Sequence, residues 1–158
     1  GLGDIGKRVA ELGLGMGMSV NYWSRKTRDD RFTYKEWDGL LKESDYIFLT
    51  ISEAPETNKF LSQEKIDIMK KGSFVINISG DEVWDFEYLE QKVKNGSIAG
   101  IALDDDRRQM YSSGTNILIT PHIAWYTKEA FEEDFRVWVE SISSVITNNP
   151  INIANNNL

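Results

Sequence analysis

Short apolar runs alternate with amphipathic stretches along most of the chain. The runs contain few polar positions, which is typical of parallel strands that are buried on both faces of a sheet. Turn residues bound each run, so each run is interpreted as one short strand. We predict strands over 18–23, 46–51, 74–78, 98–103 and 117–119.

The stretches between these runs repeat apolar residues every three or four positions, which is the period of a helix with one buried face. Two of them carry end signals. Thr33 and Glu36 have the spacing of a capping box, and Asp85 and Gly96 offer an acidic start and a glycine stop. We predict helices over 5–12, 33–43, 63–69, 85–95 and 126–147.

This alternation of strands and helices indicates βαβ units, which build a doubly wound parallel sheet of the Rossmann type. We therefore predict an α/β fold, with residues 1–147 as one domain and 148–158 as an asparagine-rich tail. Right-handed crossovers place a ligand at the carboxyl ends of the parallel strands.

Composition narrows the function classes. The chain has 158 residues and a net charge of −7, which argues against a broad nucleic-acid interface because such a surface needs clustered Lys and Arg. It has no cysteine and one histidine, which excludes disulfides, thiolate metal sites and multi-histidine metal sites. No apolar run approaches the roughly 18 residues of a membrane span, and no signal peptide is recognisable. We expect a cytoplasmic protein.

The chain opens on the glycine motif Gly1-x-Gly3-x-x-Gly6. In a dinucleotide site the first glycine allows a tight turn, the second lets the backbone approach a pyrophosphate, and the third allows close packing. Asp4 and Ile5 then begin a helix whose N–H groups point at the phosphates. A plain glycine-rich turn has the same six residues, but the following helix and strand favour the dinucleotide site. The preceding strand is missing, so we expect a sheet without it and a truncated chain.

A basic turn follows the first predicted strand and consists of Ser24, Arg25 and Lys26, with Arg28 close behind. NAD enzymes place an acidic residue near this point to bind the ribose hydroxyls. A hydroxyl with neighbouring cations would instead attract a 2′-phosphate through charge-assisted hydrogen bonds. We therefore predict NADP as the cofactor, with NAD as the alternative; a solvated basic turn that binds nothing has the same composition.

Six short segments, in their order and spacing, resemble the coenzyme domain of the D-isomer-specific 2-hydroxyacid dehydrogenases, and within that family the glyoxylate/hydroxypyruvate reductase branch. The resemblance implies an oxidoreductase that transfers hydride between a nicotinamide and a small 2-hydroxy acid. It also implies a homodimer, a separate substrate domain that this sequence does not contain, and a tail that returns to that domain. The segments are 1–6, 54–57, 69–73, 75–77, 98–104 and 120–124.

The resemblance also assigns individual residues. His122, in Thr-Pro-His-Ile-Ala, matches the histidine that donates a proton to the developing alkoxide in this family. Asp104 matches the aspartate near the nicotinamide carboxamide, and the backbone of Ile78 and Ser79 matches the segment that passes the nicotinamide ring.

Two catalytic positions depart from the family pattern. Gly80 stands where the family has an arginine that clamps the substrate carboxylate, and Arg107 stands where it has the glutamate that pairs with the histidine. The aspartates and arginines of 105–108 can replace these groups if the loop shifts in register. Three readings stay open: a working reductase, a catalytically impaired relative that binds a dinucleotide or a protein, and a truncated product with neither role.

Overall fold

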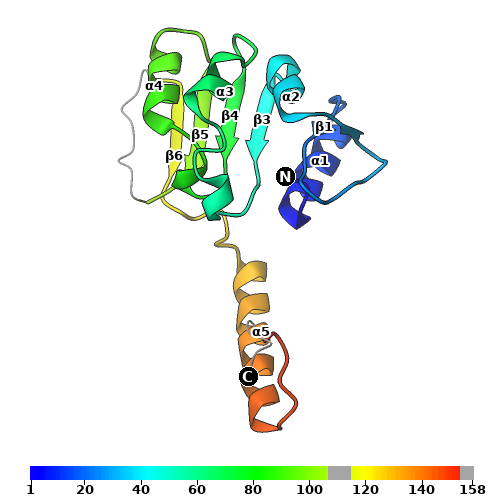
Figure 1. Cartoon of the computed structure of the whole chain (residues 1–158). Helices are drawn as coiled ribbons and strands as arrows, with labels where there is room; N and C mark the ends of the chain where they lie inside the picture. Colours follow the sequence, from blue (N-terminus) through cyan, green and yellow to red (C-terminus); the bar gives the residue numbers. More distant parts are fainter. Residues whose placement is uncertain (107–114, 154–158) are drawn as a thin grey trace. The chain divides into compact units, whose positions relative to one another are not determined.

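A computed structural model describes residues 1–106 and 115–153 of the chain. The chain divides into two compact units, Gly1–His122 and Ile123–Leu158. The first unit contains all the described strands and four of the helices (Figure 1). Its elements are α1 (Asp4–Gly15), β1 (Asn21–Tyr22), β2 (Thr33–Tyr34), α2 (Trp37–Glu43), β3 (Tyr46–Leu49), α3 (Gln63–Asp67), β4 (Phe74–Asn77), α4 (Phe86–Lys94), β5 (Gly100–Asp104) and β6 (Ile117–Thr120).

The strands form two parallel sheets. β1 pairs with β2, and the larger sheet has the order β3-β4-β5-β6. Leu49 is the register partner of Asn77, and Asn77 is also the partner of Leu103, so the carboxyl ends of the strands lie along one edge. The predicted α/β fold with a parallel sheet is confirmed. Within the described residues β1 and β3 belong to different sheets, and no strand pairs with both of them.

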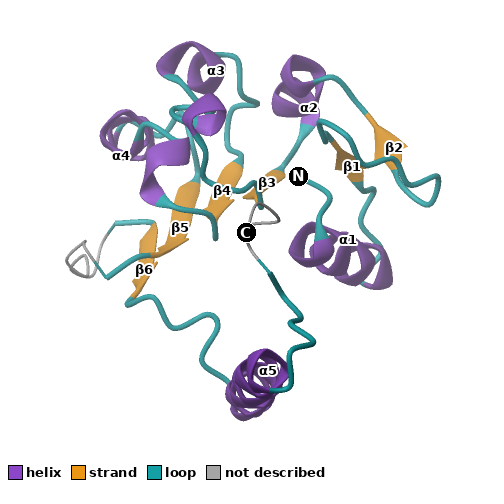
Figure 2. Ribbon diagram, turned by 60° about the horizontal axis from the view of Figure 1, so that its bottom comes forward, coloured by secondary structure: helices purple, strands orange, loops and turns teal. Residues whose placement is uncertain are grey.

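A large core lies under the four-stranded sheet. α3 and α4 lie over one face of this sheet (Figure 2), and the side chains directed there, such as Val75 and Leu103, are buried with Leu89 of α4. Tyr46 and Phe48 alternate with buried neighbours and are 51% and 42% exposed. The expectation of strands buried on both faces is therefore wrong for β3, because the described helices α3 and α4 cover only the opposite face.

A second, smaller core supports the glycine-motif end of the unit. Leu2, Ala10, Tyr22 and Phe32 are its buried members. The rings of Tyr22 and Phe32 meet edge to face at 6.5 Å, an arrangement that aromatic pairs favour. This core holds α1 against β1 and β2.

The predicted capping box at Thr33 is wrong. Thr33 and Tyr34 form β2. The helix begins at Trp37, four residues after its predicted start at Thr33, with Glu36 as its N-cap. Tyr34 packs edge to face on Tyr22 of β1, and its hydroxyl donates to Glu36 at 3.1 Å. These tertiary contacts outweigh the local capping preference, which is worth only about 1 kcal/mol.

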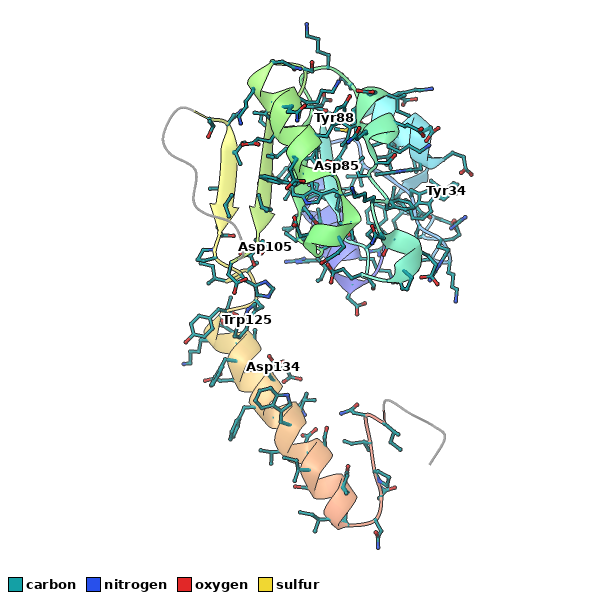
Figure 3. The ribbon with its side chains drawn as sticks, turned by 60° about the vertical axis from the view of Figure 1, so that its left-hand side comes forward. Tyr34, Asp85, Tyr88, Asp105, Trp125 and Asp134 are labelled. Carbon is teal, nitrogen blue, oxygen red and sulfur yellow. The ribbon has the colours of Figure 1, made fainter. Side chains whose placement is uncertain are left out.

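The α4 end signals are confirmed. Asp85 is the N-cap and accepts a hydrogen bond from the N–H of Tyr88 at 3.1 Å. Gly96, just after the helix, has φ 77°, a left-handed conformation that glycine adopts without a steric penalty. Figure 3 shows Asp85 and Tyr88 at the start of α4.

The second unit consists mainly of α5 (Lys128–Ile146), within the helix predicted over 126–147. Thr127 caps it by accepting from the N–H of Ala130 at 3.2 Å. None of its residues is buried, and its apolar stripe includes Phe131, Phe135 and Trp138. Among the helices of 1–106 and 115–153, none has the length and apolar character needed to cross a bilayer.

Candidate functional site

The glycine motif and the residues predicted for the nicotinamide side lie at the carboxyl edge of the four-stranded sheet, whereas Ser24, Arg25 and Lys26 follow β1 of the two-stranded sheet. The glycine motif meets this edge through Thr50, which directly follows β3 and donates its hydroxyl to the carbonyl of Gly1 at 3.0 Å. Ile78 and Ser79 follow β4, Asp104 ends β5, and His122 follows β6. A ligand at the ends of parallel strands would meet these segments together.

The glycine motif leads straight into α1. Gly3 is the N-cap, with an extended backbone and no side-chain cap, and Asp4 and Ile5 form the first turn. Ile5 is 61% exposed. A helix start that lacks a side-chain cap leaves backbone N–H groups available for an anion, and the helix dipole favours negative charge there.

The three glycines differ in the space around them. A Cβ on Gly1 would lie 2.5 Å from the carbonyl oxygen of Thr50, and one on Gly6 would lie 2.3 Å from the carbonyl oxygen of Gly1. A Cβ on Gly3 would meet nothing within 4 Å. The first and third glycines are therefore required by the packing of the protein itself. The second is not, because the space beside it is open.

The basic turn is held by its own contacts. The Ser24 hydroxyl is buried and accepts from the N–H of Thr27 at 3.3 Å. Arg28 donates to the carbonyl of Ser24 at 2.8 Å and lies 4.0 Å from the ring centre of Tyr34. Arg28 thus holds the turn in place, whereas Arg25 and Lys26 are exposed beyond it.

A second arginine ties this region to α1. The Arg31 side chain donates three hydrogen bonds to the carboxylate of Asp29, the shortest at 2.7 Å, and another to Glu11 at 2.9 Å. The hydrogen bond from Arg31 lowers the pKa of Asp29 to about 2. Asp29 and Glu11 are therefore both bound by Arg31.

The ends of β3 and β4 are linked by Ser79. Its hydroxyl donates to the carbonyl of Leu49 at 3.1 Å and accepts from the N–H of Ile51 at 3.0 Å. The side chain of Asn77 accepts from the N–H of Ser79 and donates to the carbonyl of Gly80. This network fixes the backbone at Ile78 and Ser79, where the resemblance places the nicotinamide ring.

A carboxylate fills the space beside Gly80. A Cβ on Gly80 would lie 1.3 Å from Oε1 of Glu53, so the Glu53 side chain fills the space where a side chain at position 80 would begin. The sequence reasoning missed Glu53. Its signal was available, because Glu53 follows β3 and Gly80 follows β4, and adjacent parallel strands bring their following loops together. An acid thus lies beside position 80, which the resemblance matches to a basic residue.

Asp104 and His122 lie at the ends of neighbouring strands. The carboxylate of Asp104 accepts a hydrogen bond from the hydroxyl of Thr120, and the N–H of His122 donates to the carbonyl of Thr120 at 2.9 Å. His122 is exposed and has φ 50°, a conformation that is uncommon outside glycine. Thr120 therefore positions both residues. Arg107 and Arg108 lie outside the described residues.

Comparison with known proteins gives a consistent result. The family model for the D-isomer specific 2-hydroxyacid dehydrogenase NAD binding domain matches residues 1–124. The glyoxylate reductase of Pyrococcus horikoshii is 32% identical over 133 residues, which are 78% of this chain and 40% of that protein.

Solved structures agree. An acyclic imino acid reductase in complex with NADPH and D-Arg superimposes with a TM-score of 0.86 at 28% identity, covering 98% of this chain and 52% of that one. D-lactate dehydrogenase from Aquifex aeolicus, complexed with NAD and lactic acid, gives a TM-score of 0.85 at 30% identity. The match covers 94% of this chain and 52% of that one. The chain spans about half the length of the proteins that it matches.

Proposed function

The chain belongs to the D-isomer-specific 2-hydroxyacid dehydrogenase family, whose NAD-binding domain it represents, and on this premise we propose that it binds NADP(H) at its glycine motif. The observation that carries the proposal is the open space at Gly3 beside the uncapped start of α1. The pyrophosphate would lie there, with backbone N–H groups of the helix start as donors.

The 2′-phosphate would lie against the basic turn. Arg25 and Lys26 are exposed there, and the buried Ser24 holds the turn's shape. Arg28 is occupied by the carbonyl of Ser24 and the ring of Tyr34, so its role is structural. The preference for NADP over NAD therefore depends on Arg25 and Lys26.

Calorimetric titration with NADPH and NADH tests this preference. We expect NADPH to bind at least about tenfold more tightly, which corresponds to roughly 1.4 kcal/mol. Arg25→Ala and Lys26→Ala should each weaken NADPH and leave NADH unchanged. Lys71→Ala is the matched control, because it removes an exposed cation just before β4, at the opposite edge of the sheet. Equal affinities for the two cofactors would disprove the preference.

We further propose a role in hydride transfer to a small 2-keto acid, with Asp104 near the nicotinamide and His122 as the proton donor. Both residues are held by Thr120 at the carboxyl edge of the sheet. The chain spans about half the length of these relatives, and the family resemblance leads us to propose a substrate domain outside it. Whole-protein activity, with NADPH oxidation by glyoxylate or hydroxypyruvate as the readout, tests this role, and His122→Asn should abolish turnover while cofactor affinity stays unchanged.

A second candidate is a catalytically impaired relative that binds a dinucleotide or a protein. The Glu53 carboxylate in the space beside Gly80 favours it, since a carboxylate there repels the carboxylate of a 2-keto acid instead of clamping it. NADPH binding without oxidation by either keto acid would support this candidate. Turnover that rises in Glu53→Gln would show that the acid limits an otherwise working site.

The family resemblance also leads us to propose a homodimer. Sedimentation velocity of the chain over a hundredfold range of concentration tests it, and a monomer throughout would reject a dimer formed by this chain alone.

A further inference from the structure

Arg31 follows the basic turn and binds two carboxylates that belong to different elements. Its guanidinium donates to Asp29, at the end of the turn, and to Glu11 of α1. The backbone N–H of Arg31 adds a hydrogen bond to the carboxylate of Asp29 at 3.1 Å. Because α1 begins at the glycine motif, Arg31 connects the two segments at which the pyrophosphate and the 2′-phosphate are proposed to bind.

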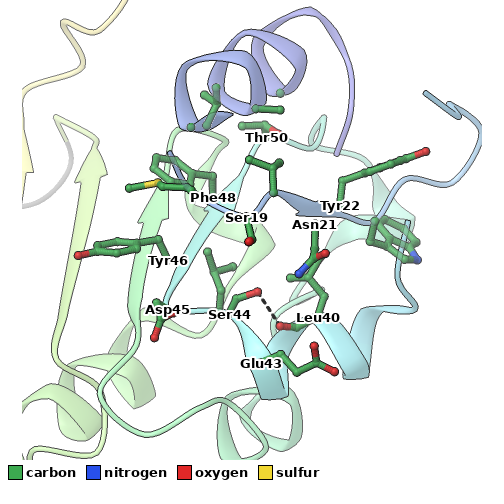
Figure 4. A pocket seen from close by; sticks show the side chains of 18 of the residues that line it. Ser19, Asn21, Tyr22, Leu40, Glu43, Ser44, Asp45, Tyr46, Phe48 and Thr50 are labelled. Atoms are coloured by element: carbon green, nitrogen blue, oxygen red, sulfur yellow. Dashed lines mark hydrogen bonds between the residues drawn. The ribbon is translucent and has the colours of Figure 1, made fainter. Parts of the chain in front are cut away.

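Asp29 is the more enclosed of the two acids. Its side chain is 14% exposed, whereas that of Glu11 is 39% exposed. The backbone N–H of Asp29 donates to the hydroxyl of Tyr22 at 2.9 Å. This hydroxyl points away from the cavity that residues of β1 and β3 line (Figure 4). The backbone and the carboxylate of Asp29 are thus both held in place beside the turn.

The negative charge of Asp29 is balanced mainly by Arg31. Hydrogen bonds from Arg31 are the largest cause of the low pKa of Asp29, about 2, and the charge of Lys7 contributes less. The carboxylate is therefore ionised throughout the neutral range. Glu11 also receives a hydrogen bond from Arg8 at 3.5 Å. Loss of Arg31 would accordingly leave the greater unbalanced charge at Asp29.

An unbalanced carboxylate at this place would change which cofactor binds. NAD enzymes use an acid near this point to accept hydrogen bonds from the ribose hydroxyls, and such an acid repels a 2′-phosphate. The repulsion is incompletely screened below a Debye length, which is about 10 Å at 0.1 M salt. Asp29 directly follows Arg28, whose guanidinium contacts the carbonyl of Ser24 at 2.8 Å, so its charge acts on the same turn.

We propose that Arg31 is a positioning residue that determines cofactor specificity, because by binding Asp29 it keeps this carboxylate from acting on the ribose end of the cofactor. The inference rests on the NADP(H) site proposed above and adds a residue that acts through another side chain. Arg25 and Lys26 attract the 2′-phosphate, whereas Arg31 removes a repulsion. Exposed ion pairs contribute little by themselves, but a guanidinium fork on a largely enclosed carboxylate fixes its geometry as well as its charge.

Calorimetric titration of the 158-residue chain with NADPH and NADH, for wild type and Arg31→Gln, tests the inference. At low salt Arg31→Gln should weaken NADPH about fivefold through the released charge, while NADH affinity stays unchanged or rises. At 1 M salt, where the Debye length is about 3 Å, the difference between wild type and variant should nearly vanish. The Arg31 side chain is 54% exposed, so the fold should tolerate its replacement, and thermal unfolding checks this.

A second substitution separates charge from structure. Asp29→Asn in the Arg31→Gln background removes the released carboxylate and should restore most of the NADPH affinity, although the contacts of Arg31 are still lost. Asp30→Asn in the same background is the matched control, because it makes the same change of net charge at the next, exposed residue. Arg31→Lys keeps the positive charge and should retain most of the preference for NADPH.

Arg136→Gln controls for the loss of an arginine that binds two acids. Arg136 belongs to the second unit and donates to Glu133 at 2.9 Å and to Glu140 at 2.6 Å, and its loss should leave the NADPH-to-NADH ratio unchanged.

Equal losses of NADPH and NADH affinity in Arg31→Gln would overturn the inference, because Arg31 would then serve the fold alone. Rescue by Asp30→Asn that is as complete as rescue by Asp29→Asn would also overturn it. A wild-type chain that binds both cofactors equally would reject the NADP preference and the inference together. A wild-type preference that survives Arg31→Gln would reject the role of Arg31 alone.

Discussion

Two hydrophobic cores lie in the unit Gly1–His122, and they differ in size and in what encloses them. The core of the four-stranded sheet has sixteen buried residues. The strands of this sheet, β3 to β6, are all hydrogen-bonded to their neighbours. The core of the glycine-motif region has four, and one side of that region borders a cavity of about 600 Å³. Stability therefore resides mainly in the larger core, whereas the proposed contacts to the cofactor's phosphates lie in the smaller region.

The largest expected effect tests this division directly. Leu89 is fully buried in the larger core, and Leu89→Ala should cost about 2–5 kcal/mol of unfolding free energy because it leaves a cavity. Phe32→Ala, in the smaller core, should instead release the amides of β1 and β2 and leave β3–β6 protected. Urea unfolding combined with residue-resolved hydrogen exchange separates the outcomes. One common loss of protection in both variants would show that the two cores unfold as one.

A smaller effect distinguishes the packing of the glycine motif from ligand binding. Gly6→Ala places a Cβ 2.3 Å from the carbonyl oxygen of Gly1 and should cost about 1–3 kcal/mol of stability through overpacking, as well as cofactor affinity. Gly3→Ala has open space around its Cβ, so its Tm should stay unchanged while NADPH affinity falls. Titration and thermal unfolding of both variants check this. Unchanged NADPH affinity in Gly3→Ala would remove the phosphates from this position.

The smallest expected effect concerns Asp85, the N-cap of α4, which packs on the larger core. Burial acts to raise the pKa of Asp85, but hydrogen bonds from Gln63 and from the N–H of Tyr88 outweigh it, so the pKa lies below its usual value. The stabilisation is therefore complete above the unfolded-state pKa, near 4, and is lost as pH falls through the lower folded-state pKa.

Asp85→Ala should cost about 1 kcal/mol at neutral pH and flatten the acid limb of the stability curve. Asp85→Asn is the control, because Asn also caps helices well. Thermal unfolding between pH 2 and pH 7 (roughly the range in which carboxyl groups titrate) measures both effects. An acid limb that is the same in wild type and Asp85→Ala would contradict the role of this carboxylate.

The sequence predicted the four-stranded sheet better than the glycine-motif region, and the cores explain why. Val75 and its neighbours in β4 form a continuous apolar run, which is a local signal of a strand. β2 has no such signal: it forms because Tyr34 packs on Tyr22 and Arg28, contacts that only the folded chain reveals. A two-residue strand between polar segments was therefore mistaken for the start of a helix.

The candidate site shows the same contrast. The glycine motif and His122 were recognisable because their residue types stand at fixed spacing. For Glu53 and Gly80, which are 27 positions apart, the sequence could show only that they follow adjacent strands. The contact between them depends on the side-chain conformation of Glu53. Motifs thus predicted a site, whereas the acid beside Gly80 is visible only in the structure.

The exposed stripe of α5 has a consequence for how this helix forms. Helix formation is cooperative with an unfavourable nucleus, and isolated helices depend on length and temperature for their population. α5 has 19 residues and none of them is buried, so its helix–coil equilibrium is governed by local propensity and by whatever covers Phe131 and Trp138. Taken alone as a peptide, this segment should therefore lose its helical far-ultraviolet circular dichroism signal gradually on heating.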